Sequence, residues 1–193
     1  MTRIVIFTLS TLDGAVDDPG RYFPNADADG PSAPGYDEVM CHLEHRLIGS
    51  QKAVLLGRGM YEEWSRYWPT SDEQPFADFI NTVPKYVLSS TDLTSRGWPD
   101  CHRVSGALVD VVDRLRRLPG DGDVGVHGSV TLVQSLLAEG LADELQLAVA
   151  PVVDPQGRRL FGRAEGIDRW ELAGCTPTET GALWLTYRPR GTS

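Results

Sequence analysis

Residues 124–133, which read VGVHGSVTLV, constrain the fold of this chain more than any other stretch. They predict a buried strand that runs through a glycine-bearing turn straight into a helix. Four apolar residues at helical spacing mark one face of this helix: Leu132, Val133, Leu136 and Leu137. Gly140 is suited to end it, because glycine tolerates the left-handed conformation that closes helices. Unpaired N–H groups at such a helix start attract phosphate, although short glycine turns also occur for purely structural reasons.

The length and composition of the chain fit one globular domain. We expect the 193 residues to form a single domain, residues 1–193, with a substantial core. No apolar run is long enough to span a bilayer, and no secretory signal opens the sequence. Cys41, Cys101 and Cys175 are too far apart for a metal site or a disulfide framework. We therefore expect a cytoplasmic protein that binds no metal.

The net charge of −9 limits the possible partners. A broad surface for nucleic acid requires clustered positive charge, so we expect no nucleic-acid partner, and the sequence indicates no membrane partner. A small anionic ligand that is held by a few local groups is still compatible with this charge.

Strand and helix signals alternate along the first two thirds of the chain. The strands are expected at residues 3–10, 52–56, 85–88, 102–104 and 124–126. The helices are expected at residues 36–48, 60–67 and 108–118 and after residue 129. The final third predicts a long strand, 144–153, and two antiparallel strands, 170–175 and 182–188. This pattern is typical of an α/β protein with a mostly parallel central sheet, an antiparallel C-terminal hairpin and helices on both faces.

Three of these strands end in residues that are suited to binding an anion. They are Gly57-Arg58, Ser89-Ser90-Thr91 and His127-Gly128-Ser129. An arginine can bind a phosphate through its forked guanidinium, and hydroxyls can donate hydrogen bonds to it. Each feature also has a common structural use, as a solvated arginine, a turn or a helix cap.

The ordered set of motifs resembles the dihydrofolate reductase fold, and within it the branch that contains the C-terminal reductase domain of bacterial riboflavin biosynthesis. Residues 10–14, Ser-Thr-Leu-Asp-Gly, resemble the Ser-x-x-Asp-Gly segment of that branch. Residues 57–61, Gly-Arg-Gly-Met-Tyr, resemble its Gly-Arg-x-x-Tyr motif. Residues 141–145, Pro151 and residues 159–161 resemble its later landmarks. The likeness extends over nearly the whole chain.

This resemblance implies NADPH as the cofactor and a small molecule as the substrate. Arg58 and the hydroxyls after the third strand would hold the 2′-phosphate, and the turn at His127 would hold the pyrophosphate. Val16 and the Asp13-Gly14 loop would close over the nicotinamide. The cofactor-binding residues implied in this way are Val16, Gly57, Arg58, Leu88, Ser89, Ser90, Thr91, Val126, His127, Gly128, Ser129 and Leu132.

The resemblance also places the substrate beside Leu9, Asp13, Tyr61 and Trp64, under a lid formed by residues 11–35. Asp13 is the expected catalytic carboxylate, which would orient a substrate amide or hydroxyl. A simple turn role before Gly14 is the alternative. Tyr61 and Trp64 have a helical spacing that suits a hydrophobic core equally well.

Two positions depart from the folate reductases. His127 replaces the first of two adjacent glycines that are joined by a cis peptide, so the geometry of the His127–Gly128 bond is open. Cys41 stands where those enzymes carry an acidic residue on a helix. Asp37, Glu38 and Glu44 are near this position but not in register, which argues against true folate reduction.

The sequence thus predicts an NADPH-dependent reductase that transfers a hydride to a small heterocyclic substrate of pterin, folate or pyrimidine type. An NADP(H)-binding module or sensor without turnover is the alternative. Because the resembled reductases are dimers, we expect a homodimer, with the C-terminal β region around Trp170 and Trp184 as its surface.

Overall fold

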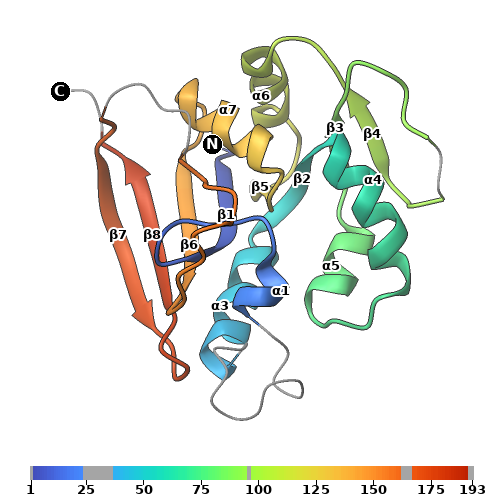
Figure 1. Ribbon diagram of the computed structural model, residues 1–193. Helices are drawn as coiled ribbons and strands as arrows, with labels where there is room; N and C mark the ends of the chain where they lie inside the picture. The colour runs from blue at the N-terminus through green and yellow to red at the C-terminus, as the bar shows by residue number, and fades with distance from the viewer. Residues whose placement is uncertain (1, 24–36, 95–96, 162–166, 191–193) are drawn as a thin grey trace. The chain divides into compact units, whose positions relative to one another are not determined.

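A computed structural model describes residues 2–23, 37–94, 97–161 and 167–190 of the protein (Figure 1). The chain divides into two compact units, each built from two segments. We call Met1–Ile6 with His45–Ala142 the parallel unit, and Phe7–Glu44 with Asp143–Ser193 the antiparallel unit, after their strands. β1 (Ile4–Thr11) and α3 (Glu38–Gly49) contribute residues to both units.

Five parallel strands form the sheet of the parallel unit. They are the first part of β1, β2 (Gln51–Gly57), β3 (Lys85–Leu88), β4 (Cys101–Val104) and β5 (Asp123–Val126). β2 lies between β3 and β5, β4 flanks β3, and β1 flanks β5. β5 is buried throughout and β2 nearly so, as expected for strands of a covered parallel sheet. Because these strands run the same way, their carboxyl ends lie at one edge of the sheet.

Helices follow β2, β4 and β5 in the parallel unit. They are α4 (Arg58–Tyr67) with the short η1 (Trp68–Thr70) and α5 (Phe76–Thr82), then α6 (Leu108–Arg116) and α7 (Val130–Ala138). The core that α4 and α5 share with the sheet consists of Val54, Leu56, Tyr61, Ile80, Val83, Val87 and Trp98.

A buried lysine fixes the start of β3. The ammonium of Lys85 donates to the carbonyls of Ile80 at 2.9 Å and Val83 at 2.6 Å, at the end of α5. Its Nζ also lies 4.9 Å from the centroid of the Trp98 ring. Burial lowers the pKa of Lys85, but the carbonyls and the ring provide the partners that a buried cation needs. The lysine thereby ties α5 to β3, the strand that leads to Ser89.

The antiparallel unit contains the second part of β1, β6 (Glu144–Ala150), β7 (Trp170–Pro177) and β8 (Leu183–Pro189), with α1 (Pro19–Tyr22) and the start of α3. β8 pairs antiparallel with both β6 and β7, so β7 is an edge strand. Trp184 of β8 is buried and stacks on Phe7, with 4.7 Å between the ring centroids. Asp37 ties α3 to the β7–β8 turn, because its carboxylate accepts hydrogen bonds from the N–H and hydroxyl of Thr180 at 3.0 and 3.1 Å.

The strands follow the hydrogen-bonded order β4-β3-β2-β5-β1-β6-β8-β7, which confirms the predicted α/β class with a mostly parallel sheet and antiparallel C-terminal strands. Some predicted bounds were wrong. α4 begins at Arg58 instead of residue 60, because Gly57 already serves as its N-cap. β6 ends at Ala150 instead of residue 153, because Pro151 cannot donate to a strand ladder. α6 ends two residues before its predicted limit.

The segment expected to be an irregular lid, residues 11–35, contains the one-turn helix α1, and its residues 24–35 lie outside the described residues. Within the described ranges, no helix has the length and apolar character that crossing a membrane requires. The same ranges contain no group of side chains suited to hold a metal ion.

Candidate functional site

The side chain of Arg58 lies at the carboxyl edge of the sheet in the parallel unit. Arg58 is the first residue of α4. The carboxylate Oε1 of Glu62, one turn later, lies 2.8 Å from Nε of Arg58. Its Nη1 donates to the hydroxyl of Ser89 at 3.2 Å, to the hydroxyl of Thr91 and to the carbonyl of Asp92 at 3.1 Å. The structure therefore brings the guanidinium together with the hydroxyls that follow β3.

Ser89 organises the turn after β3. Its side chain is buried, donates to the carbonyl of Thr91 at 2.6 Å and accepts the N–H of Thr91 at 3.2 Å. Ser90 and Thr91 are exposed, so their hydroxyls can meet a ligand, whereas Leu88 is half-buried at the strand end.

Arg103 of β4 is a second cation at this turn, and the sequence analysis missed it. Its Nη1 donates to the carbonyl of Ser89 at 3.4 Å, and its Nε lies 3.3 Å from the carboxylate of Asp92. Arg103 stands opposite Val87 in the parallel β3–β4 pair, which brings its side chain to the end of β3. The available signal was an arginine in the short strand after the serine cluster. Only the strand order shows that this strand is the neighbour of β3.

Two helix starts lie at the ends of neighbouring strands. α4 follows β2 and α7 follows β5, and neither start carries a side-chain cap. A Cβ on Gly57 would lie 2.4 Å from the hydroxyl oxygen of Ser129, so only glycine lets the end of β2 approach α7 this closely. Backbone N–H groups at two adjacent helix starts suit a ligand with more than one phosphate.

The peptide bond between His127 and Gly128 is trans, since the one cis peptide of the described residues joins Gln74 to Pro75. The chain still turns sharply here, with φ of 105° at Gly128 and 60° at Ser129. The structure thus answers the question that the sequence left open, and the turn differs from the cis diglycine of folate reductases.

His127 is 7% exposed, so it presents little more than its backbone to a ligand. Its Nε2 lies 2.6 Å from Oε1 of Gln51, and its ring contacts Phe76 and Phe79, with centroids 5.2 and 5.8 Å apart. Gly125 leaves room for this contact, because a Cβ there would lie 2.0 Å from Gln51 Oε1. Burial lowers the pKa of His127 to about 3, so a neutral ring donates from Nε2 to the amide oxygen.

Two further predicted cofactor residues, Val126 and Leu132, are buried in the core of the parallel unit. Val126 has no exposed side chain, so its backbone alone can contact a ligand.

The side chain of Asp13 joins its own loop to a second loop of the antiparallel unit. Its Oδ1 accepts hydrogen bonds from the hydroxyl of Thr11 at 2.6 Å and the N–H of Asp154 at 3.0 Å, and its Oδ2 lies 2.9 Å from Nη2 of Arg159. These partners, the Thr11 hydroxyl first, hold the pKa of Asp13 below its usual value. The carboxylate therefore stays ionised at neutral pH and can accept hydrogen bonds but not supply a proton.

The same two loops are joined along their backbones. The N–H of Val16 donates to the carbonyl of Arg158 at 3.0 Å, and the N–H of Leu160 donates to the carbonyl of Gly14 at 3.0 Å. Val16 is buried as a result. These bonds anchor the segment around Asp13, which was expected to belong to a lid.

The remaining predicted substrate residues occur in both units. Leu9 of β1 is half-buried in the antiparallel unit. Tyr61 belongs to the core of the parallel unit, and its hydroxyl donates to the carbonyl of Thr94 at 2.8 Å. Trp64 is partly buried and meets Trp68 edge-on, with centroids 5.7 Å apart. Contact of these residues with a substrate stays a prediction.

The carboxylate of α3 that turns inward is Glu44. It is 7% exposed and shares the buried face of the helix with Met40 and Ile48, whereas Cys41 is exposed. Asp37 instead caps the helix by accepting the N–H of Met40 at 2.9 Å. In the sequence, the spacing of four residues between Met40, Glu44 and Ile48 indicates that Glu44 lies on the buried face of this helix.

The sequence matches a known family model over nearly its whole length. The family is described as the RibD C-terminal domain, and the match covers residues 2–184. The chain is also 27% identical to the uncharacterized protein YyaP of Bacillus subtilis (strain 168) over 142 residues, which are 72% of this chain and 74% of that protein.

Solved structures share the fold. A putative riboflavin biosynthesis protein from Shewanella sp. PV-4 matches with a TM-score of 0.73 and 22% identity, over 98% of this chain and 99% of its own. Dihydrofolate reductase from Enterococcus faecalis, complexed with NADP(H), matches with a TM-score of 0.62 and 13% identity, over 97% and 96% of the two chains. These matches confirm the predicted dihydrofolate reductase-like fold.

The buried neutral state of His127 makes acid sensitivity a testable property. Below pH 6.5, His127 takes up a proton in the unfolded chain. In the folded protein its pKa is about 3, so the ring stays neutral over this range. The free energy of unfolding should therefore fall as the pH drops below 6.5, by roughly 1 kcal/mol per pH unit from this residue alone. Urea unfolding of wild type and His127→Gln between pH 7 and 4.5 should show a shallower fall in the variant.

His42 on the exposed side of α3 offers the matched control. The substitution His42→Gln should leave the pH dependence of unfolding as in wild type. Identical slopes for wild type and His127→Gln would contradict the neutral buried state.

Proposed function

Because the chain belongs to the RibD C-terminal domain family, we propose that it is an NADPH-dependent reductase that transfers a hydride to a small heterocyclic substrate. Membership of this family supports the oxidoreductase class, and the cofactor and a pterin-, folate- or pyrimidine-like substrate are the proposed details. The observation that carries the proposal is the convergence of Arg58 with the hydroxyls of Ser89 and Thr91 beside two uncapped helix starts.

The anion-binding groups of the parallel unit fit the phosphates of NADPH. The guanidinium of Arg58 and the exposed hydroxyls of Ser90 and Thr91 offer the positive charge and donors that a 2′-phosphate needs. The starts of α4 and α7, which approach closely at Gly57, offer backbone N–H groups to the pyrophosphate. NADH lacks the 2′-phosphate, so this set of groups favours NADPH.

A bound NADPH would supply the hydride, and the protein would hold and orient the reactants. Asp13 is ionised, so it can accept a hydrogen bond from a ring amide or hydroxyl of the substrate. The proton that completes the reduction must then come from water or from another group.

A NADP(H)-binding module without turnover is the second candidate. It is favoured by the engagement of Asp13 with Thr11, Asp154 and Arg159, which already occupy its carboxylate. An NADPH binding isotherm beside an assay of NADPH consumption with pterin, dihydrofolate and aminopyrimidine substrates separates the two. Binding with consumption supports the reductase, binding without consumption supports the module, and absence of binding contradicts both.

The first test of the cofactor concerns Arg58. Arg58→Ala should weaken NADPH roughly 10- to 100-fold, because a charge-assisted contact with the 2′-phosphate is lost, while NADH binding changes little. Fluorescence titrations with both cofactors measure this difference. Arg66→Ala, at an exposed position of the same helix, should leave both affinities unchanged. Equal losses for NADPH and NADH in Arg58→Ala would contradict a 2′-phosphate contact.

The second test concerns Asp13. Asp13→Asn should lower kcat by about tenfold, because a neutral amide orients a substrate donor less well than a carboxylate does. The Kd for NADPH should stay within a few-fold, since the proposed phosphate contacts lie in the parallel unit. Asp17→Asn, which alters the hydrogen bond that the Asp17 carboxylate accepts from the Tyr22 hydroxyl of α1, serves as the control for loop stability. Unchanged turnover in Asp13→Asn, or loss of NADPH binding, would refute the proposed substrate contact.

We also propose a homodimer, formed through one face of the β8–β7 pair. This apolar face consists of Leu172, Cys175, Leu183, Leu185 and Tyr187. Leu172 is 53% exposed and Leu183 37% exposed, which is unusual for leucines in strands. Trp170 lies on the same face as Leu172, since alternate residues of a strand share a side. Trp184 points to the opposite side and is buried, so its predicted role in the dimer surface was wrong.

Leu172→Lys should convert the dimer to a monomer, because it places a charge within the apolar face. Sedimentation velocity at micromolar concentration measures the assembly state. Val109→Lys, at an exposed apolar position of α6, should leave the dimer intact. A wild-type protein that sediments as a monomer would overturn the proposed dimer.

A further inference from the structure

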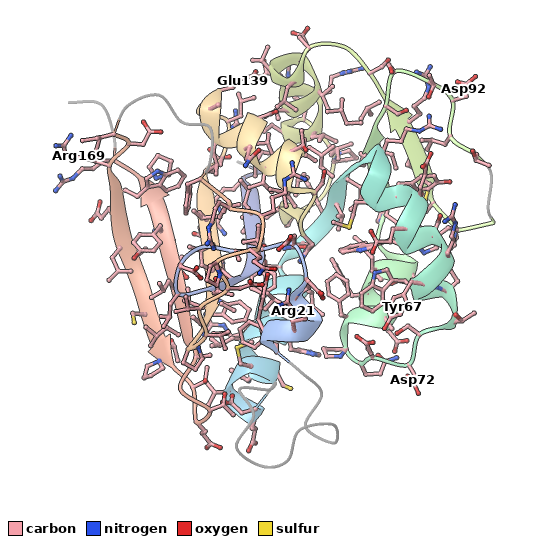
Figure 2. The ribbon with its side chains drawn as sticks, in the orientation of Figure 1. Arg21, Tyr67, Asp72, Asp92, Glu139 and Arg169 are labelled. Carbon is pink, nitrogen blue, oxygen red and sulfur yellow. The ribbon has the colours of Figure 1, made fainter. Side chains whose placement is uncertain are left out.

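We propose that Asp92 competes with the 2′-phosphate of the cofactor and thereby sets the preference between NADPH and NADH. The inference rests on the proposed cofactor and concerns the turn that follows β3. The Asp92 carboxylate lies 3.3 Å from Nε of Arg103, and its side chain is 97% exposed. Figure 2 shows Asp92 pointing outward from the parallel unit.

Two guanidinium groups converge on this turn. Nη1 of Arg58 donates to the hydroxyl of Ser89 at 3.2 Å, and Nη1 of Arg103 donates to the carbonyl of Ser89 at 3.4 Å. Their side chains are 35% and 39% exposed, so a ligand can reach both. Glu62 orients Arg58 from within α4, whereas Asp92, which pairs with Arg103, belongs to the turn itself. Asp92 therefore occupies the anion position beside Arg103.

An incoming phosphate can take this position from Asp92. An exposed ion pair stabilises a protein little, and a phosphate carries more charge and three acceptor oxygens. The turn stays in place when the carboxylate leaves, because the backbone carbonyl of Asp92 accepts the hydrogen bond from Arg58 at 3.1 Å. With NADH, the carboxylate can instead accept a hydrogen bond from the ribose 2′-hydroxyl. Asp92 thus weakens NADPH binding and supports NADH binding.

The test compares NADPH and NADH isotherms of wild type, Asp92→Asn and Asp72→Asn. Asp72 is an exposed residue far from the turn, as Figure 2 shows, and its substitution makes the same change in net charge. Asp92→Asn should bind NADPH about three- to tenfold more tightly and NADH no more tightly than wild type. The gain should shrink at high salt, which screens exposed charges. Asp72→Asn should match wild type with both cofactors.

Arg103→Gln tests the partner of Asp92. It should weaken NADPH by roughly tenfold, and Asp92→Asn should bring no gain in its presence, because the two residues act on one phosphate. Suppose that the wild type binds NADPH. If Asp92→Asn then brings no gain in affinity, or if Asp72→Asn brings an equal gain, the role of Asp92 is overturned and the proposed cofactor still stands. Absence of NADPH binding to wild type would overturn both.

Discussion

A buried hydrogen bond between Gln51 and His127 positions the edge of the parallel unit that we propose binds the cofactor. It connects the first residue of β2 to the residue that follows β5, and it needs the open space above Gly125. Burial keeps His127 neutral, so the pair adds no charge to the core. Because His127 immediately precedes the glycine turn, the bond fixes that turn relative to the strand that leads to Arg58. Loss of either partner would leave a buried polar group unsatisfied, which costs about 1–3 kcal/mol.

Close backbone packing at the same edge decides which ligands the parallel unit can hold. The end of β2 approaches the start of α7 so closely that a side chain at Gly57 would collide with Ser129. Two helix starts and two arginines then face one region of a protein whose net charge is −9. The net negative charge of the protein repels an anionic ligand at long range, but salt screens this repulsion. Short, charge-assisted hydrogen bonds are screened less, so they can still hold an anion at this edge.

The antiparallel unit shows how hydrogen bonding limits the chemistry of a carboxylate. Thr11, Asp154 and Arg159 surround Asp13 with donors and positive charge, which favour its ionised form. An acid in such surroundings can orient a reactant but is poorly suited to protonate it. The sequence motif predicts that Asp13 lies near a substrate, and the surroundings of its carboxylate suit it to accept hydrogen bonds and not to donate a proton.

The sequence by itself determined the α/β class and the alternation of elements. These features follow from the periodicity of apolar residues and from turn chemistry within a few residues. For the same reason it marked Arg58 and the serine turn, which the structure brings together and which we propose hold the cofactor. Only the tertiary structure decided that Arg103 lies beside Ser89, that His127 packs inward on Gln51, and that Trp184 faces Phe7. Each of these contacts joins residues from different elements, so it depends on strand order and side-chain packing, which local sequence patterns do not encode.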